Sequence, residues 1–351
     1  MSGSPLEGSA DMSLQLLMLG NVPVTQMVEQ AKLAEAGGYD TLWVADERFY
    51  REVYSTLAVL AQNTGRVKLG TCVTDPFARH PALTAMAIAT LDEISNQRAI
   101  LGIGAGISGF SELGIVRKKP AAAIREMIEV VRALLKGETV DFQGDVVSFI
   151  SGKLSFKPVR PDIPICVASN GPLGQRVAGA AADGAIIEGC GNVEEVKAFR
   201  ANLVEGARKK GRDPSAVKVL LRLNACVSPD GRKARDGLRP GIARMLAAGR
   251  LKFMTAEKQG LTLSPEQIAP FAQVRYADGA APYTPLLPAI TDRHVDAFTL
   301  AGSPDEVVQH MKDLKAAGAD GFIVFPMPCE GMTAEQTLVM LGKEVWPRVN
   351  S

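Results

Sequence analysis

Two loops that follow apolar runs carry residues able to hold a flat or phosphorylated ligand. The first is Gly104-Ala105-Gly106-Ile107-Ser108-Gly109, directly after the run 99–103. A loop with so little side chain lets a ligand contact the backbone, so we assign Gly104, Gly106 and Ser108 to cofactor binding. The same G-x-G-x-x-G spacing occurs in dinucleotide-binding Rossmann folds, but no acidic residue ends a second strand about 20 positions later. A tight turn without a ligand remains a third interpretation.

The second loop lies between the apolar run 163–168 and a predicted helix. Backbone N–H groups at a helix N-terminus form a ready anion site, and Ser169 and Asn170 add side-chain donors. The alternative is that this loop only caps the N-terminus of the helix and binds no ligand. We assign a phosphate-binding role to this loop, with the residues Ala168, Ser169, Asn170, Gly171 and Pro172.

Charged residues follow two other apolar runs. Asp46 and Glu47 come directly after the run 39–45, where a carboxylate could orient a cofactor ring or move a proton; surface charge is the alternative. His80 precedes Pro81 at a predicted helix start, so it either contacts a ligand or only shapes the turn. His310 lies in a regular amphipathic helix and is expected to be solvated. No spacing of His, Cys or carboxylate residues supports a metal site.

The elements that must position these residues alternate between strands and helices. Eight short apolar runs predict strands at 14–19, 39–45, 67–73, 99–103, 163–168, 184–188, 217–227 and 321–325. Amphipathic stretches predict helices between them: Leu83, Ala87, Leu91 and Ile94, for example, form a stripe that could meet a sheet. This order predicts an α/β fold, a (β/α)8 TIM barrel. The carboxyl ends of its strands, where the candidate residues lie, would form the ligand-binding face.

The pattern departs from a simple barrel in three places. Residues 1–12 are predicted to be a flexible leader, and 13–351 a single barrel domain. Residues 140–156 indicate a hairpin outside the barrel. Residues 228–298, between the seventh and eighth strands, form a looser, proline-interrupted insertion that favours a lid or an oligomer contact.

The composition of the 351-residue chain limits its partners and its compartment. A net charge of +1 gives no electrostatic reason to bind nucleic acid or an anionic membrane. The five cysteines have no CxxC spacing, which argues against a disulfide framework. We found no apolar run near the length of a membrane span and no signal-peptide pattern, so the expected location is the cytoplasm.

Five stretches, in order, resemble the bacterial-luciferase-like family, and within it the branch that contains the F420-dependent methylenetetrahydromethanopterin reductases. The resemblance covers most of 14–326. It rests on LWVADERFYREVY, VKLGTCVTDPFARHPALTAMAIATLDEIS, RAILGIGAGISGFSELGI, IPICVASNGPLGQRVAGAAADGAIIEG and AGSPDEVVQHMKDLKAAGADGFIVF.

The resemblance implies a TIM barrel that holds reduced FMN or the deazaflavin F420 non-covalently at its C-terminal face. Cys72 and Val73 match the bulge that supports the ring, where the family often has a non-prolyl cis peptide. The loop 104–109 matches the segment beside the ring and its sugar-like chain, and 168–174 the segment whose backbone holds the phosphate. Asp46 and Glu47 match the end of the second strand, which faces the reactive side.

One departure bears on the reaction. Several F420-dependent alcohol and sugar-phosphate dehydrogenases of the family carry a catalytic histidine after the second strand, where this chain has Asp46-Glu47-Arg48. The Arg/His/Glu pattern that some family monooxygenases use is not evident either, so the residues do not choose between FMN and F420. We predict an oxidoreductase, in the first place a monooxygenase that uses reduced FMN on a small organic substrate, because the branch is broad and F420 is made by fewer organisms. The alternative is an F420-dependent reductase or dehydrogenase resembling methylenetetrahydromethanopterin reductase. A further alternative is a non-catalytic flavin-binding barrel.

The expected partners are a small-molecule substrate, a separate flavin or F420 reductase, and further copies of the chain. Apolar residues in 245–254 and in the C-terminal helix suit the contact of a homo-oligomer, either a dimer or a tetramer.

Overall fold

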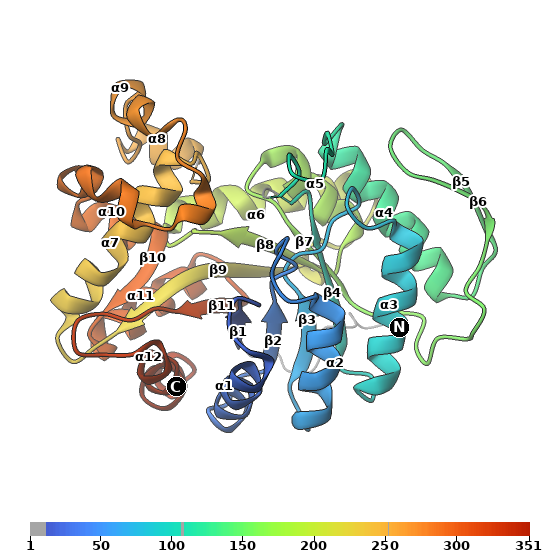
Figure 1. Ribbon diagram of the computed structural model, residues 1–351, viewed down its shortest axis with the longest axis horizontal. Coiled ribbons are helices and arrows are strands. Elements are labelled where there is room, and N and C mark those ends of the chain that lie inside the picture. Colours follow the sequence, from blue (N-terminus) through green and yellow to red (C-terminus); the bar gives the residue numbers. More distant parts are fainter. Residues whose placement is uncertain (1–11, 107–108, 252) are drawn as a thin grey trace.

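The computed structural model describes residues 12–106, 109–251 and 253–351, and in this part of the chain eight parallel strands close into a barrel (Figure 1). Pairing of β8 with β9 completes the ring. The barrel strands are β1 (Ser13–Met18), β2 (Thr41–Val44), β3 (Lys68–Thr71), β4 (Ala99–Gly104), β7 (Ile165–Ala168), β8 (Gly184–Glu188), β9 (Lys218–Val227) and β11 (Gly321–Pro326). The predicted (β/α)8 barrel is confirmed, and a Rossmann fold is excluded. Residues 1–11 of the predicted leader lie outside the described residues.

Helices connect the strands and cover the outside of the barrel. They are α1 (Val24–Ala36), α2 (Val53–Asn63), α3 (Pro81–Ile94), α4 (Pro120–Leu135), α5 (Pro172–Ala181), α6 (Val193–Lys209), α11 (Pro304–Ala316) and, after β11, α12 (Ala334–Met340) and α13 (Trp346–Val349). Several begin with proline, whose missing N–H costs nothing in a first turn. Ser303 and Glu306 form the capping box that opens α11, as the sequence pattern indicates.

Two excursions leave the barrel, and Figure 1 shows them on opposite sides of it. One is the predicted hairpin, formed by β5 (Val140–Gln143) and β6 (Ser148–Gly152). The other lies between β9 and β11 and contains α7 (Gly231–Ala247), α8 (Met254–Lys258), α9 (Pro265–Ile268) and α10 (Asp292–Phe298). It ends in a strand that we did not predict, β10 (Thr299–Gly302). That strand has four residues without alternation, and it pairs with the end of β9, from Asn224 to Val227, which only the folded chain provides.

Trp43 of β2 fills the middle of the barrel. It belongs to a buried interior group to which seven of the eight barrel strands contribute side chains. On the remaining strand, β3, a Cβ on Gly70 would lie 2.5 Å from the Trp43 ring. A Cβ on Gly102 of β4 would overlap the Thr71 carbonyl oxygen and approach the same ring to 3.0 Å. The indole Nε1 donates to Gln15 Oε1 at 2.6 Å, which satisfies the polar atom of this buried side chain.

The buried face of α3 differs from the predicted stripe. Of the predicted stripe, Leu91 is buried, but Leu83 is 51% exposed and Ile94 is 36% exposed. The other buried residues of this face lie outside the stripe: Ala85, Ile88, Ala89 and Asp92. Because α3 is apolar on more than one face, hydrophobic periodicity alone did not identify the face that packs on the barrel. The buried face is the one with small alanines, which let the helix approach the strands. Asp92 accepts two hydrogen bonds from Arg160, of 3.1 and 2.6 Å.

Most of the apolar side chains expected to form an oligomer contact pack inside the chain, whereas Val339 and Met340 of the C-terminal helix are only partly buried. Met245, Leu246, Leu251 and Phe253 are buried, as are Val345 and Trp346 near the C-terminus. These side chains therefore offer no apolar surface to a second copy. None of the helices in the described residues is long and apolar enough to cross a membrane.

The packing around Trp43 predicts a large effect from one added methyl group. We expect Gly102→Ala to lower the free energy of unfolding by about 1–3 kcal/mol, because the Cβ would overlap the Thr71 carbonyl. Chemical denaturation measures the difference, with Gly65→Ala as a matched control because a Cβ there meets nothing within 4 Å. Equal stability of Gly102→Ala and the natural protein would contradict this account of the barrel interior.

Candidate active site

The predicted site residues come together at one end of the barrel because the strands are parallel and closed. Asp46, Cys72, Gly104 and Ala168 lie at or just beyond the carboxyl ends of β2, β3, β4 and β7. Cys72 and Ala168 pack on the buried interior group yet remain partly exposed, as does Phe325 of β11. Interior-facing side chains that keep exposed surface indicate that this end of the barrel is open to solvent.

The end of β3 carries a bulge at the position that the family resemblance implies. Gly70 pairs with Ile100 and Thr74 with Ile103, so β3 has one more residue than β4 between these two pairs. The extra length lies at Cys72 and Val73, whose peptide bond is cis, as expected. A Cβ on Gly104 would lie 2.7 Å from Val73 Cγ2, so glycine at this position of β4 lets the bulge pack against the strand.

Arg48 joins the three loops that follow β2, β3 and β4. Its guanidinium forms an ion pair with Asp75 and lies 4.2 Å from the centroid of the Phe110 ring. Gly106 and Gly109 have positive φ angles of 61° and 71°, and a Cβ on Gly109 would lie 2.5 Å from Arg48 Cβ. These two glycines therefore have a packing role within the protein, which the G-x-G-x-x-G pattern alone did not indicate. The predicted cofactor residue Ser108 lies outside the described residues.

Asp46 is the titratable group at this end of the barrel that is best placed to hold a proton. Burial raises the pKa of its carboxyl, and the charge of Asp75 adds to the effect, while Thr74, Arg79 and Arg48 partly oppose it. The buried Thr74 hydroxyl lies between the Asp46 carboxyl and the Tyr54 hydroxyl and interacts with both. Burial also raises the pKa of Tyr54, and the negative charge of Asp46 acts in the same direction.

His80 is held by the scaffold. Its Nδ1 accepts a hydrogen bond from the Ala82 amide (3.1 Å), so Nε2 carries the proton and donates to the Ser148 carbonyl oxygen (2.9 Å). The ring also packs on Phe149, with centroids 5.6 Å apart. His80 thus caps α3 and ties that helix to the β5–β6 hairpin. Because both ring nitrogens have these partners, the geometry gives no support to its predicted catalytic role.

The loop after β7 leaves the first turn of α5 open. Gly171 is the N-cap and offers no side-chain hydrogen bond, and a Cβ on it would meet only Ser169 Oγ, 4.0 Å away. Pro172 occupies the first helical position and has no N–H, and the Gln175 amide donates to the Gly171 carbonyl oxygen. The amides of Leu173 and Gly174 are therefore the donors that this helix end offers to a ligand. Asn170 is instead used inside the protein. Its Oδ1 accepts from the Glu188 amide (2.9 Å), and its Nδ2 donates to the carbonyl oxygens of Glu188 and Arg250 (3.2 Å each).

Sequence reasoning missed a charged group at the same end of the barrel. Glu188 ends β8 and forms ion pairs with Arg222 of β9 and with Arg250, each with an N–O distance of 3.1 Å. Burial opposes ionisation of Glu188, but the two guanidinium charges hold the pKa of its carboxyl below the usual range. Polar residues inside otherwise apolar strands, GAIIE and KVLLRLNACV, were the available signal for Glu188 and Arg222. Arg250 had none, because it follows α7 in the insertion.

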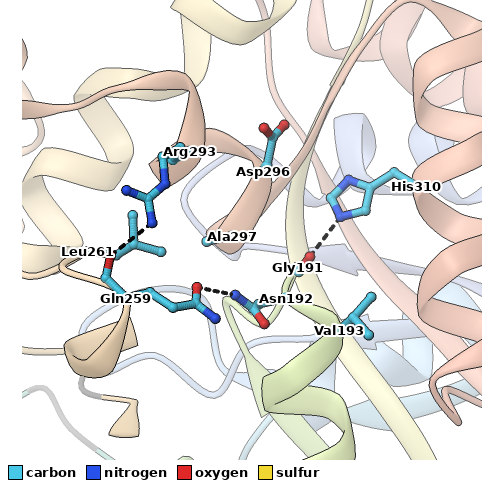
Figure 2. Close-up of a pocket in the computed structure, with 9 residues that line it drawn as sticks. All are labelled: Gly191, Asn192, Val193, Gln259, Leu261, Arg293, Asp296, Ala297 and His310. Carbon is cyan, nitrogen blue, oxygen red and sulfur yellow. Dashed lines mark hydrogen bonds between the residues drawn. The ribbon is translucent and has the colours of Figure 1, made fainter. Parts of the chain in front are cut away.

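A separate cavity of about 330 Å³ lies away from this group (Figure 2). The N-terminal end of α6, α10 and α11 line it, and none of the predicted site residues does. His310, which we expected to be solvated, is partly exposed and lines this cavity. Its Nε2 lies 2.7 Å from the Gly191 carbonyl oxygen, a contact drawn as a dashed line in Figure 2. Among the described residues, no cluster of His, Cys, Asp and Glu could hold a metal ion.

Known proteins similar to this chain fall in one family. The profile of the family described as luciferase-like monooxygenase matches residues 8–321. The 5,10-methylenetetrahydromethanopterin reductase of Methanolobus tindarius is 34% identical over 92% of this chain and 96% of its own length. An F420-dependent glucose-6-phosphate dehydrogenase of Amycolatopsis mediterranei is 27% identical over 93% of this chain and 94% of its own.

Solved structures agree with this placement. The coenzyme F420-dependent tetrahydromethanopterin reductase of Methanopyrus kandleri superposes with a TM-score of 0.82 and 26% identity, over 97% of this chain and 100% of that one. A monooxygenase from Streptomyces bottropensis superposes with a TM-score of 0.68 and 22% identity, over 96% of this chain and 99% of that one, a likeness that shows the fold alone.

The raised pKa of Asp46 predicts a pH-dependent effect on stability. A carboxyl whose pKa is higher in the folded state than in the unfolded state destabilises the fold when it is ionised. This destabilisation is complete at pH values above the folded pKa, and it is absent at pH values below the unfolded pKa of about 4. Asp46→Asn should therefore raise Tm at neutral pH, and the difference should vanish as the pH falls through this window. Thermal unfolding of both proteins across a pH series measures it. A difference that does not change with pH would show that Asp46 does not have the raised pKa.

Proposed function

Because the chain belongs to the luciferase-like monooxygenase family, we propose that this oxidoreductase is an F420-dependent reductase, and that its hydride acceptor is a small organic molecule. The single observation that carries the proposal is the 34% identity, over 92% of the chain, to a methylenetetrahydromethanopterin reductase. A one-carbon group bound to nitrogen in a reduced pterin is therefore the first acceptor to test. FMN and F420 are the two cofactors that proteins of this family use.

The open end of the barrel fits such a cofactor. The bulge at Cys72 and Val73 offers a partly exposed backbone surface beside Gly104, where a Cβ would collide with Val73. The open first turn of α5 offers N–H donors to a phosphate, with free space over Gly171. We propose that the bulge backs the planar ring and that the segment 168–172 holds the phosphate.

The residues of the chain contribute binding, orientation and proton placement. When bound in its reduced form, F420 supplies a hydride. The ion pair of Arg48 with Asp75 fixes the loops beside the ring position, and Trp43 blocks the barrel below it. Asp46, with its raised pKa, holds a proton at the end of β2. We propose that it exchanges this proton with the substrate or the cofactor, and that Glu47 lies on the same reactive side.

The comparisons favour F420 over FMN, and so favour the alternative of the sequence interpretation over its main one. The relatives with the higher identities, from 34% to 27%, bear F420-dependent or methanopterin reductase names. The monooxygenases appear only as structures of low identity, such as 22%. The segment Asp46-Glu47-Arg48 contains no histidine, whereas several family dehydrogenases carry a catalytic histidine after the second strand, and this difference also favours a reductase.

Titration of the purified protein with F420, FMN and reduced FMN, followed by fluorescence or absorbance, tests the cofactor. We expect saturable binding of F420 that is at least tenfold tighter than that of either flavin. Turnover is then measured as F420 oxidation or reduction with methylenetetrahydromethanopterin and with glucose 6-phosphate as separate substrates. Preference for FMN would support the monooxygenase interpretation, and binding of none of the three would contradict the proposal.

The phosphate loop gives a second, local prediction. Gly171→Val should weaken F420 binding roughly tenfold, about 1.4 kcal/mol, because the side chain would enter the space in front of the α5 N-terminus. Its stability should change little, since a Cβ at Gly171 meets no close atom and the φ angle is an ordinary −97°. Gly171→Ala is the matched control and should have a smaller effect. Unchanged affinity in Gly171→Val would place the phosphate elsewhere.

A further inference from the structure

We propose that an arginine cluster opposite the ring position, formed by Arg222, Arg250 and Arg244, receives an anionic group of the substrate, either a carboxylate or a phosphate. The cluster is the one built around Glu188. This inference deepens the proposed function and rests on it, because it treats the Cys72–Val73 bulge as the support of the cofactor.

The cluster is part of the candidate active site. Arg222 and Glu188 lie on neighbouring strands, β9 and β8, and their charges act on the thiol of Cys72. Arg222 also lies 5.9 Å from the centroid of the Phe325 ring, which faces the barrel interior. A molecule seated between the bulge and this cluster would therefore contact both. Under the proposed function, a hydride acceptor would occupy this position.

The insertion supplies the remaining members of the cluster. Arg250, Arg244 and Tyr276 all belong to the segment between β9 and β10. The guanidinium of Arg244 lies 3.6 Å from the centroid of the Tyr276 ring, and that of Arg250 lies 4.6 Å from it. The Asn170 side chain donates a hydrogen bond to the carbonyl oxygen of Arg250 and so holds the backbone at that residue. The aromatic ring thus keeps two cations together at the edge of the open barrel end.

The charges of the cluster do not balance. Arg222 and Arg250 share one carboxylate, Glu188, which among the described residues is the only acidic partner within ion-pair distance of either. Arg244 adds a third positive charge and forms no ion pair with a described carboxylate; its Nη2 donates to the Tyr276 carbonyl oxygen at 2.5 Å. Glu47 contributes a second negative charge, which acts on Arg250. Three cations and two carboxylates leave one positive charge for a ligand.

The hydrogen bonding of this region is incomplete as well. The Nε atoms of Arg244 and Arg250 and the Oδ1 atom of Asn224 are buried without a partner among the described residues. Asn224 lies two residues beyond Arg222 on β9, so its side chain emerges on the same face of the strand. Buried polar atoms without partners are rare, and three in one region indicate that a further group completes them.

The chemistry of the cluster selects the class of ligand. Guanidinium groups form paired, charge-assisted hydrogen bonds with carboxylates and phosphates. Glu188 already occupies part of the donor set, so it competes with an incoming anion. Because of this competition, removing an arginine should weaken anion binding, whereas neutralising Glu188 should strengthen it. If the cluster had only a structural role, both kinds of substitution would weaken anion binding or destabilise the fold.

The test measures anion binding and cofactor binding separately. Isothermal titration with inorganic phosphate and with succinate, each with and without F420, gives the anion affinity and distinguishes the two ligand types. Fluorescence titration gives the F420 affinity. The variants are Arg250→Ala, Arg222→Ala and Glu188→Gln. Arg293→Ala, an exposed arginine of the same insertion outside the barrel end, is the matched control.

We expect Arg250→Ala and Arg222→Ala to weaken binding of the preferred anion at least tenfold and Glu188→Gln to strengthen it at least threefold. F420 affinity should change less than twofold in all variants, and Arg293→Ala should resemble the natural protein. Absence of saturable anion binding in both the natural protein and Glu188→Gln would overturn the proposal. So would weaker F420 binding in Arg250→Ala with unchanged anion affinity, because the cluster would then serve the cofactor. Failure of the natural protein to bind F420 would instead count against the proposed function, and the anion titrations without cofactor would still decide this inference.

Discussion

Trp43 occupies the barrel interior at the level where β2, β3 and β4 meet, and its indole determines which residues can surround it. Seven strands contribute a side chain or more to this group, while β3 has Gly70 at the corresponding place because a Cβ would collide with the ring. Glycine at position 102 lets β4 approach β3, because a Cβ there would overlap the Thr71 carbonyl oxygen. The tight contact of β3 and β4 then leads directly into the bulge at Cys72 and Val73. The candidate cofactor site therefore lies directly on the packed interior of the barrel and depends on that packing.

Above this layer, two charged groups organise the open end of the barrel. Arg48, paired with Asp75 and stacked on Phe110, fixes the loops after β2, β3 and β4. Glu188, shared by Arg222 and Arg250, joins β8, β9 and the insertion. Buried or half-buried ion pairs gain little net stability, because desolvation offsets the attraction. Their value here is positional: they hold loops from distant parts of the sequence around one space, with Asp46 on one side and the arginines on the other.

A site made partly of backbone and partly of charged side chains suggests how one type of barrel can serve several oxidoreductases. The bulge and the α5 N-terminus present mainly backbone, so in the proposed function they would hold the parts of the cofactor that need no particular side chain. The charged side chains at this end of the barrel come instead from strand ends and from the insertion, where Glu47, Glu188 and Arg250 lie. A change of substrate would then require changes in a few charged side chains and leave the barrel intact.

The sequence by itself determined the order of the barrel strands, the helices between them and the end of the barrel at which the candidate site residues lie. These features follow from local hydrophobic periodicity, from proline and capping signals, and from the rule that parallel strands end on one face. It could not determine which face of α3 is buried, that β10 pairs with the end of β9, or that His80 and Asn170 are engaged inside the scaffold. It also did not reveal the cluster of Glu188, Arg222 and Arg250, whose members lie up to 62 residues apart. Each of these depends on contacts between distant segments, and such contacts exist only after the barrel has closed and brought the segments together.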